Sequence, residues 1–523
     1  MADRLVSMNQ LEGFQLEGTP VRRQEAKTES RGAGRPRFKW INREQNELRV
    51  FVLDQLIEEQ HAARAIWEFL GELDLTGFEA EIKAVEGRAG QATFEPRLLA
   101  ALWLYAYSEG IGSAREVARC CEHEPGFRWL CGDEAVNYHT LADFRVQHEA
   151  ALHALFVDAL GVLSYHKLVT LKRVAHDGTR IRAWASGDSF HRETKLEQHL
   201  SAAEAQVSGL ESEAAESYSV RQKAARRRAA EQRWERLRQA RQQLEQIQEQ
   251  RKGAQEKAAA RVSESEPEAR IMKMPEGRFA PAYNAQVTTD SQAGIIVNVE
   301  VTQLGSDFPQ LTPALEQVKE NFGKLPDQVL ADGGFLNREN IVALEGRTDL
   351  IGPYDEEQRY SEAQRKRLGI HEEFATKFFI YDPVSNQFQC PAGKALRSSQ
   401  SKVLEHKVEH YYRAVESDCQ ACPHKTRCCP QTRQRSILRI EEVPAMQRFR
   451  QKMQAEDAKT IYKQRARLAE FPFCWIKEKF RFRRFHVRGL AKAQAEILWA
   501  ALAYNIRQWM RLCWNKPYLP SLP

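Results

Sequence analysis

The feature that most constrains the fold is a series of short apolar runs between residues 171 and 351. Val297, Val299 and Val301 alternate with polar residues, as in a strand with one buried face. Between residues 309 and 322, apolar residues recur at intervals of three and four, as in an amphipathic helix. The runs predict strands at 171–177, 283–289, 294–301, 329–331 and 350–351, and helices at 309–322 and 340–344. This order predicts an α/β fold with a mixed sheet.

Two segments interrupt this core. Residues 195–262 consist largely of Ala, Glu, Gln, Arg and Lys, which predicts a long helix or a helical hairpin inserted as an arm. One stretch of the arm, residues 224–241, is strongly basic, so the arm either lies along DNA phosphates or is simply solvated. Residues 355–442 form a second, small insertion that contains five of the ten cysteines. Without the insertions, 166–354 and 443–515 have the element order of an RNase H-like core.

The N-terminal part is expected to contain a tail and a helical domain. Residues 1–45 are polar and lack hydrophobic periodicity, which predicts a disordered basic tail. Its Arg35-Pro-Arg37 core resembles an AT-hook, so these arginines either bind a narrow minor groove or belong to a solvated tail. Residues 46–165 have helical periodicity throughout. We expect an all-helical domain that binds DNA, or alternatively a dimerisation bundle.

Charge and cysteine content limit the class of protein. There are 77 Lys and Arg residues against 71 Asp and Glu, so the net charge of +6 suits a nucleic-acid binder only if the basic groups cluster. No run approaches the ~20 apolar residues of a membrane span, and no secretory signal is visible. We therefore expect a cytoplasmic protein with no membrane partner. In a reducing compartment, clustered cysteines indicate metal ligands rather than disulfides.

Three acidic residues are the candidate catalytic groups. Asp177 and Asp332 each follow an apolar strand and precede a glycine, and Glu470 lies in a later, basic, helix-like run. Two strand-borne carboxylates and one helix-borne carboxylate suit two-metal phosphoryl transfer, so Asp177, Asp332 and Glu470 are expected to bind Mg²⁺ or Mn²⁺. Taken singly, Asp-Gly after a strand is more often a turn, and a lone glutamate more often a surface ion pair. Glu478 is the rival third acid.

The cysteine-containing insertion has the ligand set of a zinc site. Cys419 and Cys422 are two residues apart, Cys428 follows, and Cys390 lies upstream. Four thiolates suit a tetrahedral structural Zn²⁺. Cys428 is preferred over the adjacent Cys429, because two neighbouring cysteines seldom both bind one ion. The alternative is a group of reduced cysteines in a small subdomain.

Cations and aromatics alternate after the third acid, between residues 477 and 488. The candidate DNA-binding cations are Lys477, Arg481, Arg483 and Arg484. Such a composition can follow a phosphate backbone and stack on unpaired bases. The alternative is a helix with a buried Phe face and a solvated Arg face.

From about residue 48 to 509, the chain resembles the DDE transposases of bacterial insertion sequences. The resemblance is carried by Val174-Ala-His-Asp177-Gly-Thr-Arg180, Tyr283-Asn-Ala-Gln286, Leu330-Ala-Asp332-Gly-Gly-Phe335, Thr140-Leu-Ala-Asp143-Phe-Arg145, the Cys-x-x-Cys-Pro insertion, and Tyr462, Arg465, Glu470 and Lys477. There are departures from the family pattern. Phe335 replaces a frequent tyrosine, the gap between Arg465 and Glu470 is one residue longer than usual, and Pro472 follows the glutamate.

The resemblance implies a function and its partners. Such an enzyme binds the terminal inverted repeats of its element, cleaves the DNA ends, and joins the 3′-hydroxyl to target DNA by transesterification. By analogy Asp177, Asp332 and Glu470 form the metal-binding triad, and Tyr462, Arg465 and Lys477 contact double-stranded DNA. A homodimer on DNA, in association with the nucleoid, is expected. The alternatives are an inactive transposase-derived DNA-binding protein and a metal-dependent nuclease without strand transfer.

Overall fold

The computed structural model describes residues 52–80, 82, 92–212, 220–354, 356–404 and 407–514. The expected basic tail, with Arg35 and Arg37, lies outside these residues. Within these ranges, no helix combines the length and the apolar character that crossing a bilayer requires.

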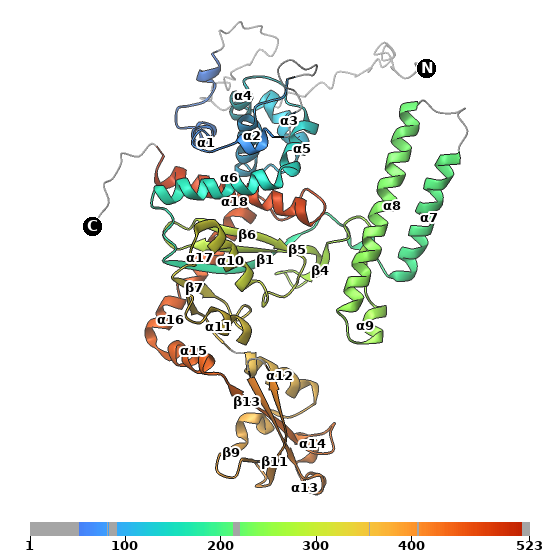
Figure 1. Cartoon of the computed structure of the whole chain (residues 1–523), viewed down its shortest axis with the longest axis vertical. Helices are drawn as coiled ribbons and strands as arrows, with labels where there is room; N and C mark the ends of the chain where they lie inside the picture. Colours follow the sequence, from blue (N-terminus) through green and yellow to red (C-terminus); the bar gives the residue numbers. More distant parts are fainter. Residues whose placement is uncertain are drawn as a thin grey trace, which may run out of the picture. The chain divides into compact units, whose positions relative to one another are not determined.

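A six-stranded mixed sheet forms the centre of the protein (Figure 1). Its strands are β1 (Arg173–Arg182), β4 (Arg270–Lys273), β5 (Phe279–Asp290), β6 (Ile296–Thr302), β7 (Gln328–Ala331) and β8 (Asp349–Ile351). The main order is β6-β5-β1-β7-β8, and β4 pairs with the first residues of β5. β5 is antiparallel to both β6 and β1, whereas β1, β7 and β8 are mutually parallel. The alternating and apolar runs of the sequence therefore form strands, and β4 is an additional strand.

Helices connect the parallel strands and cover the sheet. α10 (Leu311–Phe322) links β6 to β7, and α11 (Arg338–Leu344) links β7 to β8. On one face, Ala175 of β1 and Leu330 of β7 pack against Ala469 of α17 (Arg465–Cys474). α17 continues directly into a π-helical turn, η6 (Trp475–Lys479), and is preceded by α15 (Pro444–Gln454) and α16 (Glu456–Tyr462).

The N-terminal helices share a hydrophobic core with the sheet and with the last helix, α18 (Leu490–Leu512). They are α1 (Ala62–Leu70), α2 (Pro96–Ser108), α3 (Ala114–His123), α4 (Pro125–Cys131), α5 (Tyr138–Gln147) and α6 (Glu149–Tyr165). α18 contacts α1, α2, α5 and α6 as well as β6. Nearly all of its central residues are buried, so this helix joins the N-terminal helices to the sheet.

A buried polar cluster lies where α18 meets α2 and α5. Glu496 is fully buried and accepts hydrogen bonds from the backbone N and the Nδ1 of His486, both at 2.8 Å. Tyr107 Oη donates to the same carboxylate at 3.3 Å, and Arg145 Nη1 lies 3.5 Å from it. Arg145 Nη1 also donates to the carbonyl oxygen of Gly112 at 2.6 Å. Each buried charge therefore has a partner, as burial requires.

The arm is a helical hairpin of α7 (Glu193–Ser212) and α8 (Val220–Glu249), followed by the short α9 (Ala254–Ala258). Its own small core consists of Leu196, Ala203, Leu237, Ala240, Leu244, Ala260 and Val262. A two-stranded antiparallel sheet of β2 (Phe190–His191) and β3 (Val262–Ser263) joins the two ends of the arm. This region therefore forms a helical hairpin whose two helices pack through a narrow row of apolar residues.

The cysteine-containing insertion is built on a second, antiparallel sheet in the order β13-β12-β11-β10-β9. Its elements are α12 (Glu356–Arg367), β9 (Ile380–Asp382), β10 (Gln387–Gln389), β11 (Ala395–Leu404), β12 (Lys407–Ala414), α13 (Glu416–Gln420), α14 (Lys425–Cys428) and β13 (Ser436–Glu442). Tyr412 and Leu396 are fully buried at its centre. This insertion thus has a core of its own.

We predict that Glu496→Ala destabilises the protein by about 3–5 kcal/mol, because it leaves Arg145 buried without its carboxylate partner. The measurement is the urea midpoint and the Tm of the full chain, compared with Lys492→Ala. Lys492 lies on the exposed face of the same helix, so its substitution should change stability by less than about 0.5 kcal/mol. Equal effects of the two substitutions would contradict the assigned role of Glu496.

Candidate functional site

Asp177 lies inside strand β1 rather than at its end. The Cα of Asp177 pairs with Val287 of β5, and β1 continues to Arg182 with partners on β5 throughout. The expectation that the strand ends in a glycine turn at Asp177 is therefore wrong. What ends here is the parallel pairing with β7, whose last pair is His176 with Ala331. The carboxylate thus projects from the point at which one neighbouring strand stops.

Asp332 directly follows β7 on the same face of the sheet. Ala175 and Leu330 are register partners, and both pack against α17. Because side chains alternate along a strand, Asp177 and Asp332, each two residues further on, project toward that same face. Asp332 Oδ1 accepts a hydrogen bond from the backbone N of Gly334 at 2.7 Å, which fixes the turn after the strand.

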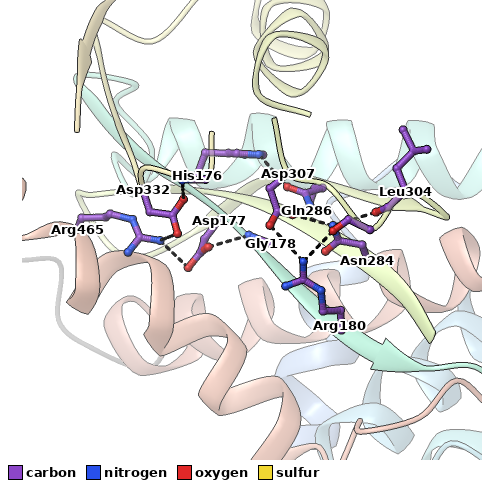
Figure 2. Close-up of polar contacts among 12 residues, drawn as sticks. His176, Asp177, Gly178, Arg180, Asn284, Gln286, Leu304, Asp307, Asp332 and Arg465 are labelled. Carbon is purple, nitrogen blue, oxygen red and sulfur yellow. Dashed lines mark hydrogen bonds and ion pairs between the residues drawn. The ribbon is translucent and has the colours of Figure 1, made fainter. Parts of the chain in front are cut away.

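Arg465, the first residue of α17, joins the two carboxylates (Figure 2). Its Nη2 lies 2.9 Å from Asp177 Oδ2 and 3.7 Å from Asp332 Oδ2. Burial raises the pKa of Asp177 to about 6, the Arg465 guanidinium opposes this shift, and the neighbouring Asp332 adds to it. The site therefore combines two acidic groups of one sheet face with a single cation between them.

Two further residues of the predicted signature lie on this face. Tyr462 is half-buried beside the apolar residues that α17 covers, and burial raises its pKa. Lys477, in the π-helical turn, donates from Nζ to Thr179 Oγ1. Thr179 is two residues beyond Asp177 and therefore shares its side of the strand. Burial lowers the pKa of Lys477.

The structure does not bring Glu470 into this cluster. It is five residues after Arg465, about 140° around the helix, whereas Ala469 lies about 40° away and is buried against the sheet. Glu470 is exposed and has no hydrogen bond or ion pair within the described part of the chain. In that part, the carboxylate oxygens of Asp177, Asp332 and Glu470 are not all within 4.8 Å of one another. The rival acid Glu478 is also exposed, in an ion pair with Arg483.

Pro472 lies deep inside a continuous helix. α17 begins at Arg465 and runs through Pro472 into the π-helical turn, so the helix does not restart near Glu470. A proline has no N–H to donate to the carbonyl four residues before it, which here is that of Leu468. This segment is therefore less firmly hydrogen-bonded than an ordinary helix.

A polar cluster lies behind β1, and the sequence did not identify its central residue, Asp307. Asp307 Oδ1 accepts hydrogen bonds from Asn284 Nδ2 at 2.7 Å and from Gln286 Nε2 at 3.0 Å, and its Oδ2 lies 3.4 Å from Arg180 (Figure 2). Gly178 faces this cluster, since a Cβ there would meet Gln286 Nε2 at 2.5 Å and Asp307 Oδ1 at 2.9 Å. The signal in the sequence was the alternation of Asn284 and Gln286 along a strand.

The segment after Lys477 is irregular, and its aromatic residues are buried. Phe480, Phe482 and Phe485 are at most 3% exposed, so the expectation that aromatics here stack on bases is wrong. Arg481, Arg483 and Arg484 are exposed. The Arg484 guanidinium lies 5.7 Å from the ring centre of Trp184. The segment therefore exposes its arginines, while its buried phenylalanines fix it to the hydrophobic core.

The predicted zinc ligands line one small pocket of the cysteine-containing insertion. They are Cys390, Cys419, Cys422 and Cys428. Two of the sulfur atoms accept backbone hydrogen bonds, Cys390 from Lys394 at 3.3 Å and Cys419 from Arg435 at 3.4 Å. No three of the cysteine sulfurs in the described residues lie within 4.8 Å of one another. Cys429 lines the same pocket, and Lys425 Nζ lies 3.6 Å from its sulfur.

The donor sets fit the metals expected from the sequence. Asp177 and Asp332 offer carboxylate oxygens, which hard divalent cations prefer, and the exposed fractions of 19% and 41% leave room for water ligands. The cysteine pocket offers sulfur ligands, which suit Zn²⁺, although burial raises the pKa of Cys419 and raises that of Cys428 to about 12.

Comparison with known proteins gives two family matches. Residues 389–510 match the model of the transposase DDE domain, and residues 51–147 match a transposase domain (DUF772). The first match includes Tyr462, Arg465, Glu470 and Lys477, whereas Asp177 and Asp332 lie outside both ranges. No curated protein matches the chain.

One solved structure matches, the cryo-EM structure of a piggyBac transposase synaptic complex with hairpin DNA. The identity is 8%, and the match covers 87% of this chain and 82% of the other. The TM-score is 0.23, too low for this likeness to support a conclusion.

We predict that Gly178→Ala destabilises the protein by about 1–3 kcal/mol, because the added Cβ overlaps the groups that surround Asp307. Gly187→Ala is the matched control, since nothing lies within 4 Å of the Cβ it would add. Both variants are compared with the parent by thermal and urea unfolding. A Gly178→Ala protein as stable as the control would show that the close contact behind β1 is not a constraint.

Proposed function

Because the chain has the two matched regions of a DDE transposase of the insertion-sequence type, we propose that it binds the terminal inverted repeats of an insertion sequence, cleaves the DNA ends and joins the 3′-hydroxyl to target DNA. The observation that carries the proposal is the convergence of Asp177 and Asp332 on Arg465 of the matched region. A transposase DDE domain generally implies dependence on a divalent metal.

We infer that the central sheet is an RNase H-like core. Three antiparallel strands, β6, β5 and β1, are followed by the parallel strands β7 and β8, with crossover helices α10 and α11. In such a sheet β1 and β7 are neighbours, so side chains of two distant segments meet at one point. This supports assigning Asp177 and Asp332 as the two strand-borne acids.

Asp177 and Asp332 would hold Mg²⁺ or Mn²⁺. Glu470, the acid of the Tyr-Arg-Glu-Lys signature, is exposed and lies apart from them in this structure, so it would complete the set only if α17 turned it toward the aspartates. When bound, the ions supply a strong oxygen nucleophile and neutralise charge on the phosphate. Arg465 offsets the negative charge of the two carboxylates. Lys477, anchored on Thr179, places a cation beside the same face, where a scissile phosphate would lie.

We propose that exposed arginines hold the DNA. Arg481, Arg483 and Arg484 are exposed close to Lys477 in sequence, and phosphate contacts by such residues position DNA without reading its sequence. Arg35 and Arg37 are proposed to add contacts from the tail. Because the reaction cuts two ends of one element, we propose that a homodimer assembles on double-stranded DNA.

We also propose Zn²⁺ at Cys390, Cys419, Cys422 and Cys428, where it would stabilise the small insertion.

Substitution of the strand-borne acids tests the proposal. Asp177→Asn and Asp332→Asn should each reduce cleavage of a labelled terminal repeat by roughly 10³-fold or more, because metal-assisted stabilisation is worth several kcal/mol. Binding of the repeat, measured by gel shift, should persist. A variant that still nicks the repeat in Mg²⁺ at the parent rate would refute the assignment.

A strand-transfer assay distinguishes the proposed function from its two alternatives. A pre-cut end with a free 3′-hydroxyl, mixed with a target plasmid, yields joined products only if the protein catalyses strand transfer. Cleavage without joining would identify a metal-dependent nuclease. Binding without either reaction would identify an inactive, transposase-derived DNA-binding protein.

The third acid has its own test. Glu470→Gln should lower cleavage by roughly 10²-fold or more if this residue joins the aspartates at the metal. Glu478→Gln should change cleavage little, because it removes only an exposed ion pair with Arg483. The opposite pattern, with Glu478→Gln inactive and Glu470→Gln active, would move the third acid to Glu478.

A further inference from the structure

Two histidines and a glutamate, none of them among the proposed catalytic residues, meet at the base of the arm. His191 ends strand β2, His199 lies in the second turn of α7, and Glu264 follows β3. Their ligand atoms all lie within 4.8 Å of one another, and this is the group of that kind found in the described residues. The site therefore joins the segment that enters the arm to the segment that leaves it.

The three donor atoms have the spacing of a metal site. His199 Nδ1 lies 2.7 Å from Glu264 Oε2, and His191 Nε2 lies 3.8 Å from Glu264 Oε1. In a tetrahedral Zn²⁺ site with ligand bonds of about 2.0–2.1 Å, donor atoms are about 3.3 Å apart. The two measured distances fall on either side of that value.

The surrounding structure holds the donors in place. His191 pairs with Val262 across the two-stranded sheet, and the backbone N of Glu264 donates to the carbonyl oxygen of Ser189 at 3.0 Å. One turn of helix before His199, Leu196 is fully buried and packs in the same small core as Val262. The backbone of all three donors is thus fixed by pairing and packing before any ion binds.

The exposure of the donors also suits a metal. The side chains of His199 and Glu264 are 30% and 33% exposed. An ion could therefore enter from solvent, and water could occupy a fourth position.

We propose that His191, His199 and Glu264 bind a transition-metal ion of the Zn²⁺ class, which fastens the base of α7 to strand β3. Two imidazoles and one carboxylate form a ligand set that Zn²⁺ uses in proteins. The role is structural: the ion crosslinks the two ends of the arm and sets the start of α7. The hydrogen bond between His199 and Glu264 already links these two segments.

Metal stoichiometry of the full chain tests the proposal. After removal of metals by a chelator, the protein is dialysed against Zn²⁺ and bound zinc is measured by mass spectrometry. The double variant His191→Ala/His199→Ala should bind one Zn²⁺ per chain less than the parent. The control is His123→Ala/His139→Ala, which removes two exposed histidines and should bind as much as the parent. Any zinc held by the cysteine-containing insertion is common to all three proteins. Equal zinc content in the double variant and the parent would overturn the proposal.

A conservative variant guards against misfolding of the double variant. Glu264→Gln keeps the size of the side chain and a hydrogen-bonding oxygen but removes the charged ligand. We expect its Tm in chelator to match that of the parent, and the increase in Tm on adding Zn²⁺ to be smaller than in the parent. An equal Zn²⁺-induced increase in the two proteins would overturn the proposal.

Discussion

The central position of β1 is the constraint on which the site depends. One edge of this strand pairs antiparallel with β5 along its length, and the other pairs parallel with β7 over only four residues, 173–176. Asp177 therefore projects where β7 has ended, beside the turn that carries Asp332. Two carboxylates so placed repel each other, and burial raises the pKa of Asp177. Arg465 offsets both effects, so the arrangement of the two carboxylates depends on the register of the sheet and on the position of α17.

Much of the core could be predicted from the sequence, because its strands and helices have regular apolar patterns. β5, β6, β7, α10 and α11 lie where alternation and helical periodicity place them. β4 was not predicted, because Arg270–Lys273 is short and contains only two apolar residues, Ile271 and Met272. The course of β1 was misjudged because Asp-Gly is usually a turn, whereas here the glycine provides space for Asp307 and Gln286.

The pair of strand-borne acids and the local signature residues of the candidate site were predictable, but the way α17 meets them was not. Arg465 and Tyr462 are one turn apart, and a residue pattern can group them. The contact of Arg465 with Asp177 depends on how α17 packs across the sheet, which no spacing encodes. The same holds for Glu470, whose direction is set by the burial of Ala469 and by the continuity of the helix through Pro472. For His191, His199 and Glu264, the sequence separation hides their proximity at the base of the arm.

The short pairing of β2 with β3 has a consequence for how such chains diversify. Phe190 pairs with Ser263 and His191 with Val262, so the two ends of the arm are adjacent in space. The entropy of closing a loop grows slowly with its length, so helices of very different size can occupy this position at similar cost. An arm of different length could therefore close on β2 and β3 without displacing β1 and β5.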